Sequence, residues 1–367
     1  MSEGALTGFT VAVTAERRRD EMAALLQRRG ARVVTASAIA IVPLADDQAL
    51  HAATSACIGL IPDLVVATTG FGFRGWLEAA DGWGNGDLLR AVLGRARLIA
   101  RGPKPCGAIR AAGLTEEWAA KTESTDEILE RLLADGVAGK RIVVQEHGEP
   151  QTEFVAALRG AGAAVVEVPV YRWVLPADTG PVKRLADAIC AGQIDAVTFT
   201  SAPAVRAFLQ VAGDAEPGVL DRFRSGRTLA ACVGPVTAGP LTGRDVPVVM
   251  PERYRLGALI KTVTDELPRR AVRLRVAGTI LEVRGHAVLI DDVAHTLAPA
   301  AMAILAALTV RPGVVVSKDQ LVASLPRGND GHAVDVAVAR LRTALGSGRH
   351  IETVIKRGYR LRVDEPA

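Results

Sequence analysis

Residues 332–361 carry side chains whose types and spacing suit the recognition of DNA. The first half, HAVDVAVARLRTALG, predicts a helix, because apolar residues recur at i, i+4, i+7 and i+11 and form one buried face. That face consists of Val334, Val338, Leu341 and Leu345. His332, Val336 and Arg340 lie roughly opposite, with Arg342 at the flank. A helix with one buried and one basic face can enter the major groove of DNA.

The second half, IETVIKRGYRL, predicts a basic hairpin beside that helix. Two β-rich runs, ETVI and YRLRV, flank Lys356-Arg357-Gly358, and a short turn with glycine between such runs is typical of a hairpin. Two cations in the turn suit contacts with DNA phosphates. The alternative is a domain of the same shape that contacts only protein.

The uneven charge of the chain favours a nucleic-acid-binding C-terminal part. The chain has 44 Lys and Arg against 40 Asp and Glu; residues 269–367 hold 15 and 9 of them, and residues 1–268 hold 29 and 31. The positive excess therefore lies at the C-terminal end, as expected for a module that faces phosphates. A solvated basic surface explains the same numbers equally well.

Length and composition predict two or three globular domains. At about 100–200 residues each, 367 residues allow that number. The opening MSEGALTGF lacks the features of a signal peptide, and the longest apolar run, near 297–310, is too short to span a membrane. Cys57, Cys106, Cys190 and Cys232 are scattered without metal-ligand spacing. We therefore expect no metal, no cofactor, no membrane contact and a cytoplasmic location.

The region before the basic part repeats itself at a constant offset of 132 positions. RRGARVV matches RGAGAAVV, with Gly30 against Gly162. DLVVATTGFGFRGWL matches DAVTFTSAPAVRAFL, with Asp63 against Asp195, and ARLIARGPKP matches RTLAACVGPVT. Three blocks at one offset predict a duplicated unit.

Each copy predicts a parallel α/β fold. VAVTA, RVVTA, LVVAT and RLIA are continuous apolar runs, which are typical of strands in a sheet covered on both faces, and amphipathic helices separate them. Two Rossmann-like lobes follow from this alternation. Because ligands of such sheets bind beyond the carboxyl ends of the strands, the candidate groups lie in residues 14–19, 68–72, 101–106, 146–148, 200–202 and 234–237.

Residues 9–265 resemble uroporphyrinogen-III synthase, the enzyme that closes hydroxymethylbilane into a ring while inverting its last pyrrole. The resemblance rests on VAVTAERRRDEMAALLQRRGARVV, VPVYRWVLP, VTFTSAPAVRAF and CVGPVTAGPL. It implies a discontinuous first lobe of residues 1–39 and 174–265, an inserted lobe of residues 40–173, and a two-stranded connection. For an active synthase it also implies three catalytic residues, Tyr171, Ser201 and Thr237.

The inserted lobe departs from the synthases, which puts catalysis in doubt. Thr69-Gly70 replaces a Thr-Ser turn, and residues 102–106 read GPKPC in place of Gly-x-x-Thr-Ala, so that a hydroxyl is lost. Cations near the strand ends still suit a small anion or a tetrapyrrole-like ligand, although a solvated surface accounts for them equally well. The candidates for such a ligand site are Arg17, Arg18, Thr69, Gly70, Arg101, Lys104, Tyr171, Ser201 and Thr237.

Residues 70–75 also match the dinucleotide-binding pattern GxGxxG between a strand and a helix. That pattern normally opens the first βαβ unit, whereas here it follows a later strand. Its repeat partner, residues 202–207, contains no glycine. We therefore expect a turn that approaches its neighbours closely and no nucleotide site.

Residues 272–363 resemble the winged-helix effector domain of OmpR/PhoB-type response regulators. The match is most specific in VDVAVARLRTALG and IETVIKRGYRL. We expect this domain over residues 272–367, after a linker at 266–271. The resemblance places four residues toward the bases: His332, Val336, Ala337 and Arg340. It places five at phosphates or in the wing: Arg342, Thr353, Lys356, Arg357 and Tyr359.

The chain as a whole is similar to actinobacterial regulators that fuse these two parts, among them a regulator of nitrate and nitrite assimilation. That resemblance implies an activator that binds double-stranded promoter DNA, with a partner regulator, RNA polymerase and a dimer on DNA as possible further contacts. One alternative is a working synthase with an accessory DNA-binding tail. Another is a scaffold that contacts a partner regulator through the 326–331 loop or a lobe surface.

Overall fold

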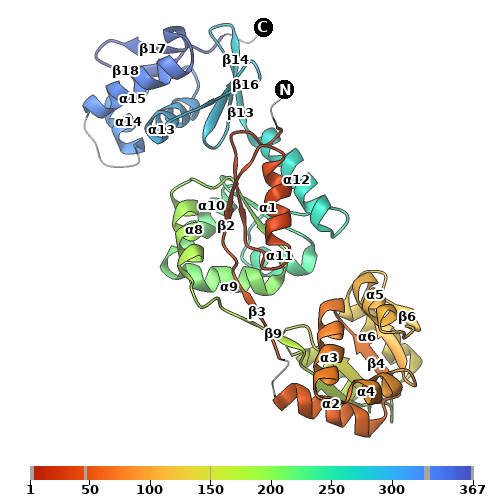
Figure 1. Cartoon of the computed structure of the whole chain (residues 1–367). Coiled ribbons are helices and arrows are strands. Elements are labelled where there is room, and N and C mark those ends of the chain that lie inside the picture. Colours follow the sequence, from red (N-terminus) through yellow and green to blue (C-terminus); the bar gives the residue numbers. More distant parts are fainter. Residues whose placement is uncertain (1–3, 45–47, 149, 326–330, 365–367) are drawn as a thin grey trace. The chain divides into compact units, whose positions relative to one another are not determined.

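The computed structural model describes residues 4–44, 48–148, 150–325 and 331–364. The chain divides into two compact units, residues 1–39 with 175–367 and residues 40–174. Each unit contains a five-stranded parallel sheet, and the first also contains the C-terminal domain (Figure 1). In the described part of the chain, no helix has the length and apolar character needed to cross a membrane.

The first lobe has a sheet in the order β12-β11-β10-β1-β2. Its strands are β1 (Thr10–Val13), β2 (Arg32–Thr35), β10 (Ala196–Phe199), β11 (Leu229–Cys232) and β12 (Val248–Val249). Its helices are α1 (Arg19–Gln27), α8 (Gly180–Cys190), α9 (Ala202–Ala212), α10 (Glu216–Arg224), α11 (Pro235–Thr242) and α12 (Leu256–Arg270), with the short η1 (Gly213–Ala215). The strands β1, β10 and β11 are fully buried, as continuous apolar runs require.

The second lobe has a sheet in the order β6-β5-β4-β7-β8. Its strands are β4 (Leu64–Ala67), β5 (Arg97–Ala100), β6 (Trp118–Ala119), β7 (Arg141–Gln145) and β8 (Ala164–Val168). Its helices are α2 (Gln48–Leu60), α3 (Gly70–Gly82), α4 (Gly86–Leu93), α5 (Pro103–Ala111), α6 (Thr125–Asp135) and α7 (Thr152–Gly160). The two-stranded connection is the antiparallel pair β3 (Ala40–Pro43) and β9 (Tyr171–Val174).

The two sheets confirm the predicted duplication. The offset of 132 residues carries β4 and β5 onto β10 and β11, and the two strand orders correspond position by position. Each lobe combines segments of both copies. The β1-α1-β2 unit of the first copy joins the first lobe, where β1 pairs with β10 of the second copy. The β7-α7-β8 unit of the second copy joins the second lobe, where β7 pairs with β4 of the first copy. The repeat pattern alone does not reveal this exchange of units between the copies.

The C-terminal domain has the winged-helix architecture that the resemblance implies. An antiparallel sheet is formed by β13 (Val272–Val276), β14 (Thr279–Val283), β15 (Ala287–Ile290) and β16 (Val293–Thr296). The helices α13 (Pro299–Thr309), α14 (Lys318–Ser324) and α15 (Gly331–Ala344) follow, and then η2 (Gly348–His350) and the hairpin of β17 (Ile351–Val354) and β18 (Gly358–Leu361). One apolar core joins the sheet, the three helices and the hairpin.

The linker predicted at 266–271 is wrong over most of its length. Helix α12 continues to Arg270 and leaves Ala271 as the residue between it and β13. Leu267 is buried in the core of the first lobe, and Glu266 pairs with Arg269 and Arg270 one turn later. Burial and these pairs favour the helix although Pro268 lies in its last turn.

Candidate DNA interface and ligand sites

Helix α15 turns one row of side chains outward. His332, Val336 and Arg340 are exposed and follow each other at intervals of four residues. On the opposite side the predicted apolar face is buried in the domain core: Val334, Val338, Leu341 and Leu345. This buried face holds the helix against α13 and α14, so the outward row is presented by a rigid element.

Ala337 does not face outward, which corrects its predicted place toward the bases. It is only 2% exposed and belongs to the core of the domain. The reason is helical geometry, because Ala337 lies three residues after Val334 and four before Leu341 and so shares their face. Ala339 is exposed, so the outward surface of α15 still offers few polar groups.

Arg342 connects α15 to the hairpin. Its guanidinium donates to the carbonyl oxygen of Ile351 at 2.8 Å from Nη2 and 3.2 Å from Nε, and to the hydroxyl of Thr353 at 2.8 Å. It also lies 5.8 Å from the centre of the Tyr359 ring. The residue predicted at a phosphate position therefore also fixes the hairpin relative to the helix.

Asp335 and Lys318 form a charged group on this surface that sequence reasoning missed. The Lys318 ammonium lies 2.8 Å from the Asp335 carboxylate, and the buried Tyr359 donates its hydroxyl to that carboxylate at 2.6 Å. The hydrogen bonds from Lys318 and Tyr359 lower the pKa of Asp335. Lys318 thereby offsets a negative charge that would repel DNA phosphates. No local pattern could have paired two residues so far apart in the chain.

The turn between β17 and β18 presents three side chains to solvent. Val354 pairs with Gly358, and the turn consists of Ile355, Lys356 and Arg357. Lys356 takes a positive φ of 61°, and Gly358 one of 131°. Both cations are exposed, and Ile355 is 80% exposed. The predicted cationic turn thus carries an apolar side chain as well.

In the first lobe the ligand candidates lie at the carboxyl end of the sheet. Arg17 and Arg18 follow β1, Ser201 follows β10, and Thr237 lies buried in the first turn of α11 after β11. The side chain of Arg18 donates to Glu21 at 2.6 Å. The Ser201 hydroxyl accepts from the N–H of Ala204 at 3.3 Å and caps α9. Two of these groups therefore already have structural partners.

In the second lobe Thr69 and Gly70 open α3. The Thr69 hydroxyl accepts from the N–H of Gly72 at 3.1 Å and from Nε2 of Gln145 at 3.0 Å. A Cβ at Gly70 would overlap the carbonyl oxygen of Lys104, and one at Gly72 would overlap Nε2 of Gln145. Close packing therefore accounts for the first two glycines of GxGxxG, as the sequence predicts.

Three groups at the carboxyl ends of β5 and β7 lack partners among the described residues. The guanidinium of Arg101, directly after β5, has no hydrogen bond or ion pair within that part of the chain. Burial lowers its pKa, although the charges of Tyr171 and Glu123 act in the other direction. Among the same residues the buried atoms Oε1 of Gln145 and Nδ1 of His147 have no hydrogen-bond partner. Burial and then the charge of Arg101 lower the pKa of His147 to about 3, so the ring is neutral. Buried polar groups normally find partners, so this group suits a ligand.

Tyr171, the catalytic candidate in this lobe, is only 3% exposed. Its ring packs against Phe71 and Trp173, with ring centres 5.4 and 6.0 Å away. The described residues hold no cluster of three His, Cys, Asp or Glu side chains arranged as metal ligands.

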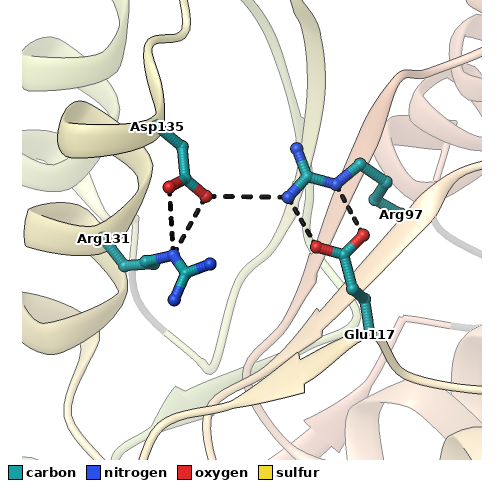
Figure 2. Close-up of polar contacts among 4 residues, drawn as sticks. All are labelled: Arg97, Glu117, Arg131 and Asp135. Atoms are coloured by element: carbon teal, nitrogen blue, oxygen red, sulfur yellow. Dashed lines mark hydrogen bonds and ion pairs between the residues drawn. The ribbon is translucent and has the colours of Figure 1, made fainter.

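The charged side chains at the amino end of β5 are paired, in contrast to Arg101 at its carboxyl end. Arg97 pairs with Glu117 at 2.5 Å and with Asp135 at 3.6 Å, and Asp135 pairs with Arg131 at 3.0 Å (Figure 2). These side chains are all substantially exposed, so solvent screens the pairs and each contributes little to stability. Each charge here has a partner, which indicates a structural role in joining β5 to α6.

Comparisons with known proteins match the two parts separately. Residues 20–261 match the family model described as uroporphyrinogen-III synthase HemD. Residues 292–361 match the model described as transcriptional regulatory protein, C terminal.

Individual proteins match the same segments. The uncharacterized protein YjjA of Bacillus subtilis (strain 168) is 29% identical over 257 residues, which is 70% of this chain and 94% of YjjA. A mutant uroporphyrinogen III synthase from the extreme thermophile Thermus thermophilus is 26% identical with a TM-score of 0.59, over 71% of this chain and all of that one. The RstA DNA-binding domain of Klebsiella pneumoniae, solved with the RstA box, is 25% identical with a TM-score of 0.22, over 25% and 96% of the two chains.

Proposed function

We propose that this chain, which belongs to the uroporphyrinogen-III synthase family over residues 20–261, is a transcriptional regulator that binds double-stranded promoter DNA. The observation that carries the proposal is the match of residues 292–361 to the C-terminal domain of transcriptional regulatory proteins. The exposed row on α15 and the two cations of the β17–β18 turn support it. The domain is of the OmpR/PhoB type.

In this proposal α15 lies in the major groove. Arg340 pairs with a guanine, and Val336 contacts a thymine methyl. Lys356 and Arg357 bind phosphates, which position the domain without reading sequence. Because Ala337 is buried and the side chain of Ala339 is a methyl group, few polar side chains reach the bases. Specificity then calls for a second subunit on DNA, a partner regulator or RNA polymerase.

The test is to map the genomic sites of the full chain by footprinting and to measure binding to one of them. Arg340→Ala should weaken that binding about 10-fold or more and relax base selection. Arg311→Ala removes an exposed cation of the same domain outside α15 and the turn, so it serves as the control. Equal binding of the wild-type chain to the site and to a scrambled duplex would exclude the proposal.

We further propose that the regulated genes serve nitrate and nitrite assimilation, that the protein activates them, and that it works in the cytoplasm. The support is the resemblance of the fused architecture to such regulators. Deleting the gene should prevent induction of nitrate and nitrite reductase transcripts when nitrate is the nitrogen source. Unchanged induction would remove the nitrogen assignment and leave DNA binding untouched.

The second lobe is proposed to sense a small anion or a tetrapyrrole-like carboxylate. The Arg101 guanidinium supplies a positive charge that has no hydrogen bond or ion pair among the described residues. Nδ1 of His147 can donate a hydrogen bond to the ligand, because Nε2 of the neutral ring faces the Gln151 amide nitrogen. Nitrate, nitrite and uroporphyrin are the probes, and ligand-induced change in the melting temperature is the measurement. Arg101→Gln should abolish the change, whereas Arg97→Gln at the other end of β5 should retain it.

The second candidate function is uroporphyrinogen-III synthesis, which family membership favours. The lost hydroxyl in residues 102–106 argues against it, as does the use of Ser201 as a helix cap. Conversion of hydroxymethylbilane to the type III isomer by the purified chain decides this point. A scaffold acting through the 326–331 loop is a third candidate, but residues 326–330 lie outside the described residues.

A further inference from the structure

The turn between β14 and β15 packs on the amino end of the first lobe's sheet, within the same compact unit. Arg284 in this turn is charged and yet only 9% exposed. Its Nη1 donates to the carbonyl oxygens of Thr7 at 2.7 Å and Ala5 at 3.3 Å, and its Nε donates to Glu282 at 2.7 Å. The guanidinium lies 5.2 Å from the centre of the Phe9 ring. A buried guanidinium with this many partners marks a built contact.

The next two residues complete the contact. The N–H of His286 donates to the carbonyl oxygen of Gly8 at 2.8 Å, and its Nδ1 lies 3.3 Å from the Thr10 hydroxyl. Gly285 lies directly on Asp195, because a Cβ at position 285 would overlap the Asp195 carboxylate. Glycine is therefore required here for close approach, and its φ lies outside the left-handed region.

Asp195 is equivalent to Asp63 in the duplication, so the two residues show how the surroundings of this carboxylate differ between the lobes. Each carboxylate accepts from the first N–H of the adjacent strand, from Thr10 at 2.7 Å and from Arg141 at 2.8 Å. Asp63 also pairs with the Arg141 guanidinium at 3.0 Å. Thr10, the counterpart of Arg141 in the first lobe, has an uncharged side chain that cannot form this ion pair. The turn of the DNA-binding domain covers Asp195 instead.

We infer that Arg284, Gly285 and His286 form an interdomain latch, which holds the DNA-binding domain on the amino end of the first lobe's sheet. The connection through the chain is short, since Ala271 alone separates α12 from β13. Opening the latch frees the domain to turn about this residue. The latch lies at the end of β10 opposite Ser201, so the latch residues do not lie at the carboxyl end of that sheet, where the ligand candidates of this lobe are.

Gly285→Ala in the full chain tests the latch without DNA, so the outcome is independent of the proposed function. The added methyl group collides with Asp195 and should open the latch. Hydrogen exchange of the His286 amide, bonded to Gly8 in the closed state, should rise at least about 10-fold. Amides of α15 and β10 should keep their protection, because both domains stay folded.

Two further variants make the result decisive. Gly348→Ala adds a methyl group in the same domain where no atom lies within 4 Å, and its exchange should match wild type. Asp195→Ala combined with Gly285→Ala removes the colliding carboxylate and should restore protection of the His286 amide. Wild-type exchange in Gly285→Ala would overturn the latch. Loss of protection throughout the DNA-binding domain would also overturn it, because the turn would then be part of that domain's own core.

Discussion

Two aspartates, Asp63 and Asp195, occupy equivalent positions at the amino ends of the two lobes' sheets, and their pKa values are shifted in opposite directions. In the second lobe, the hydrogen bonds from Arg141 lower the pKa of Asp63 to about 2. In the first lobe, burial raises the pKa of Asp195 to about 6, although the Thr10 N–H and the charge of Arg222 act in the other direction. The duplicated backbone therefore places both carboxylates alike, and the neighbours that each lobe acquired decide their chemistry.

Asp195→Asn should produce the largest change in this comparison. Asparagine keeps an acceptor for the Thr10 N–H and removes a charge that burial penalises, so the free energy of unfolding should rise by about 1–3 kcal/mol at pH 7.5. Urea denaturation of the full chain measures it. A loss of stability at that pH would show that the Asp195 charge is well compensated.

The stability gain from Asp195→Asn should also depend on pH, in a direction set by the pKa of Asp195. Because the folded-state pKa of Asp195 is raised, the folded chain binds more protons between about pH 4 and 6, and its stability falls as pH rises through that window. The gain from Asp195→Asn should therefore vanish near pH 4 and be complete above pH 7. His286, whose pKa burial lowers, shifts wild-type stability in the other direction. The difference between variant and wild type cancels that contribution.

Asp63→Asn should change the free energy of unfolding in the opposite direction and by a smaller amount than Asp195→Asn. It removes a partly exposed pair with Arg141, so stability at pH 7 should fall by about 1 kcal/mol. The wild-type contribution is present above the ordinary pKa of aspartate and is lost as pH falls toward 2. A cycle with Arg141→Thr, which gives the second lobe the side chain of Thr10, separates the pair from the backbone hydrogen bond. Equal effects of Asp63→Asn with and without Arg141 would contradict the assignment.

The smallest changes in stability are expected from substitutions at the two ends of β5, Arg97→Gln and Arg101→Gln. Arg97→Gln breaks pairs with Glu117 and Asp135 and should lower the free energy of unfolding by about 0.5 kcal/mol. Arg101→Gln breaks no ion pair within the described residues and relieves a desolvated charge, so stability without ligand should stay within about 0.5 kcal/mol or rise. Thermal melts in low and high salt distinguish the two, since only the Arg97 effect should shrink as salt screens the pairs.

Much of the fold could be predicted because its signals are local. Continuous apolar runs marked the buried strands of both lobes, and the constant offset marked the duplication. The stripe from Val334 to Leu345 marked the buried face of α15. The linker predicted at 266–271 and the base-facing position predicted for Ala337 were wrong for the same reason. Leu267 and Ala337 are buried by packing against other elements, and that packing cannot be predicted from local composition.

The sequence by itself determined which segments form strands and helices, that the α/β unit occurs twice, and that a basic winged helix follows. Periodicity and repetition within the chain carry that information. Tertiary structure alone decided that the copies exchange a βαβ unit, that Lys318 neutralises Asp335, and that Asp195 is covered by Gly285 while Asp63 pairs with Arg141. Those outcomes depend on contacts between residues far apart in the chain, and the pKa of each carboxyl group follows from them.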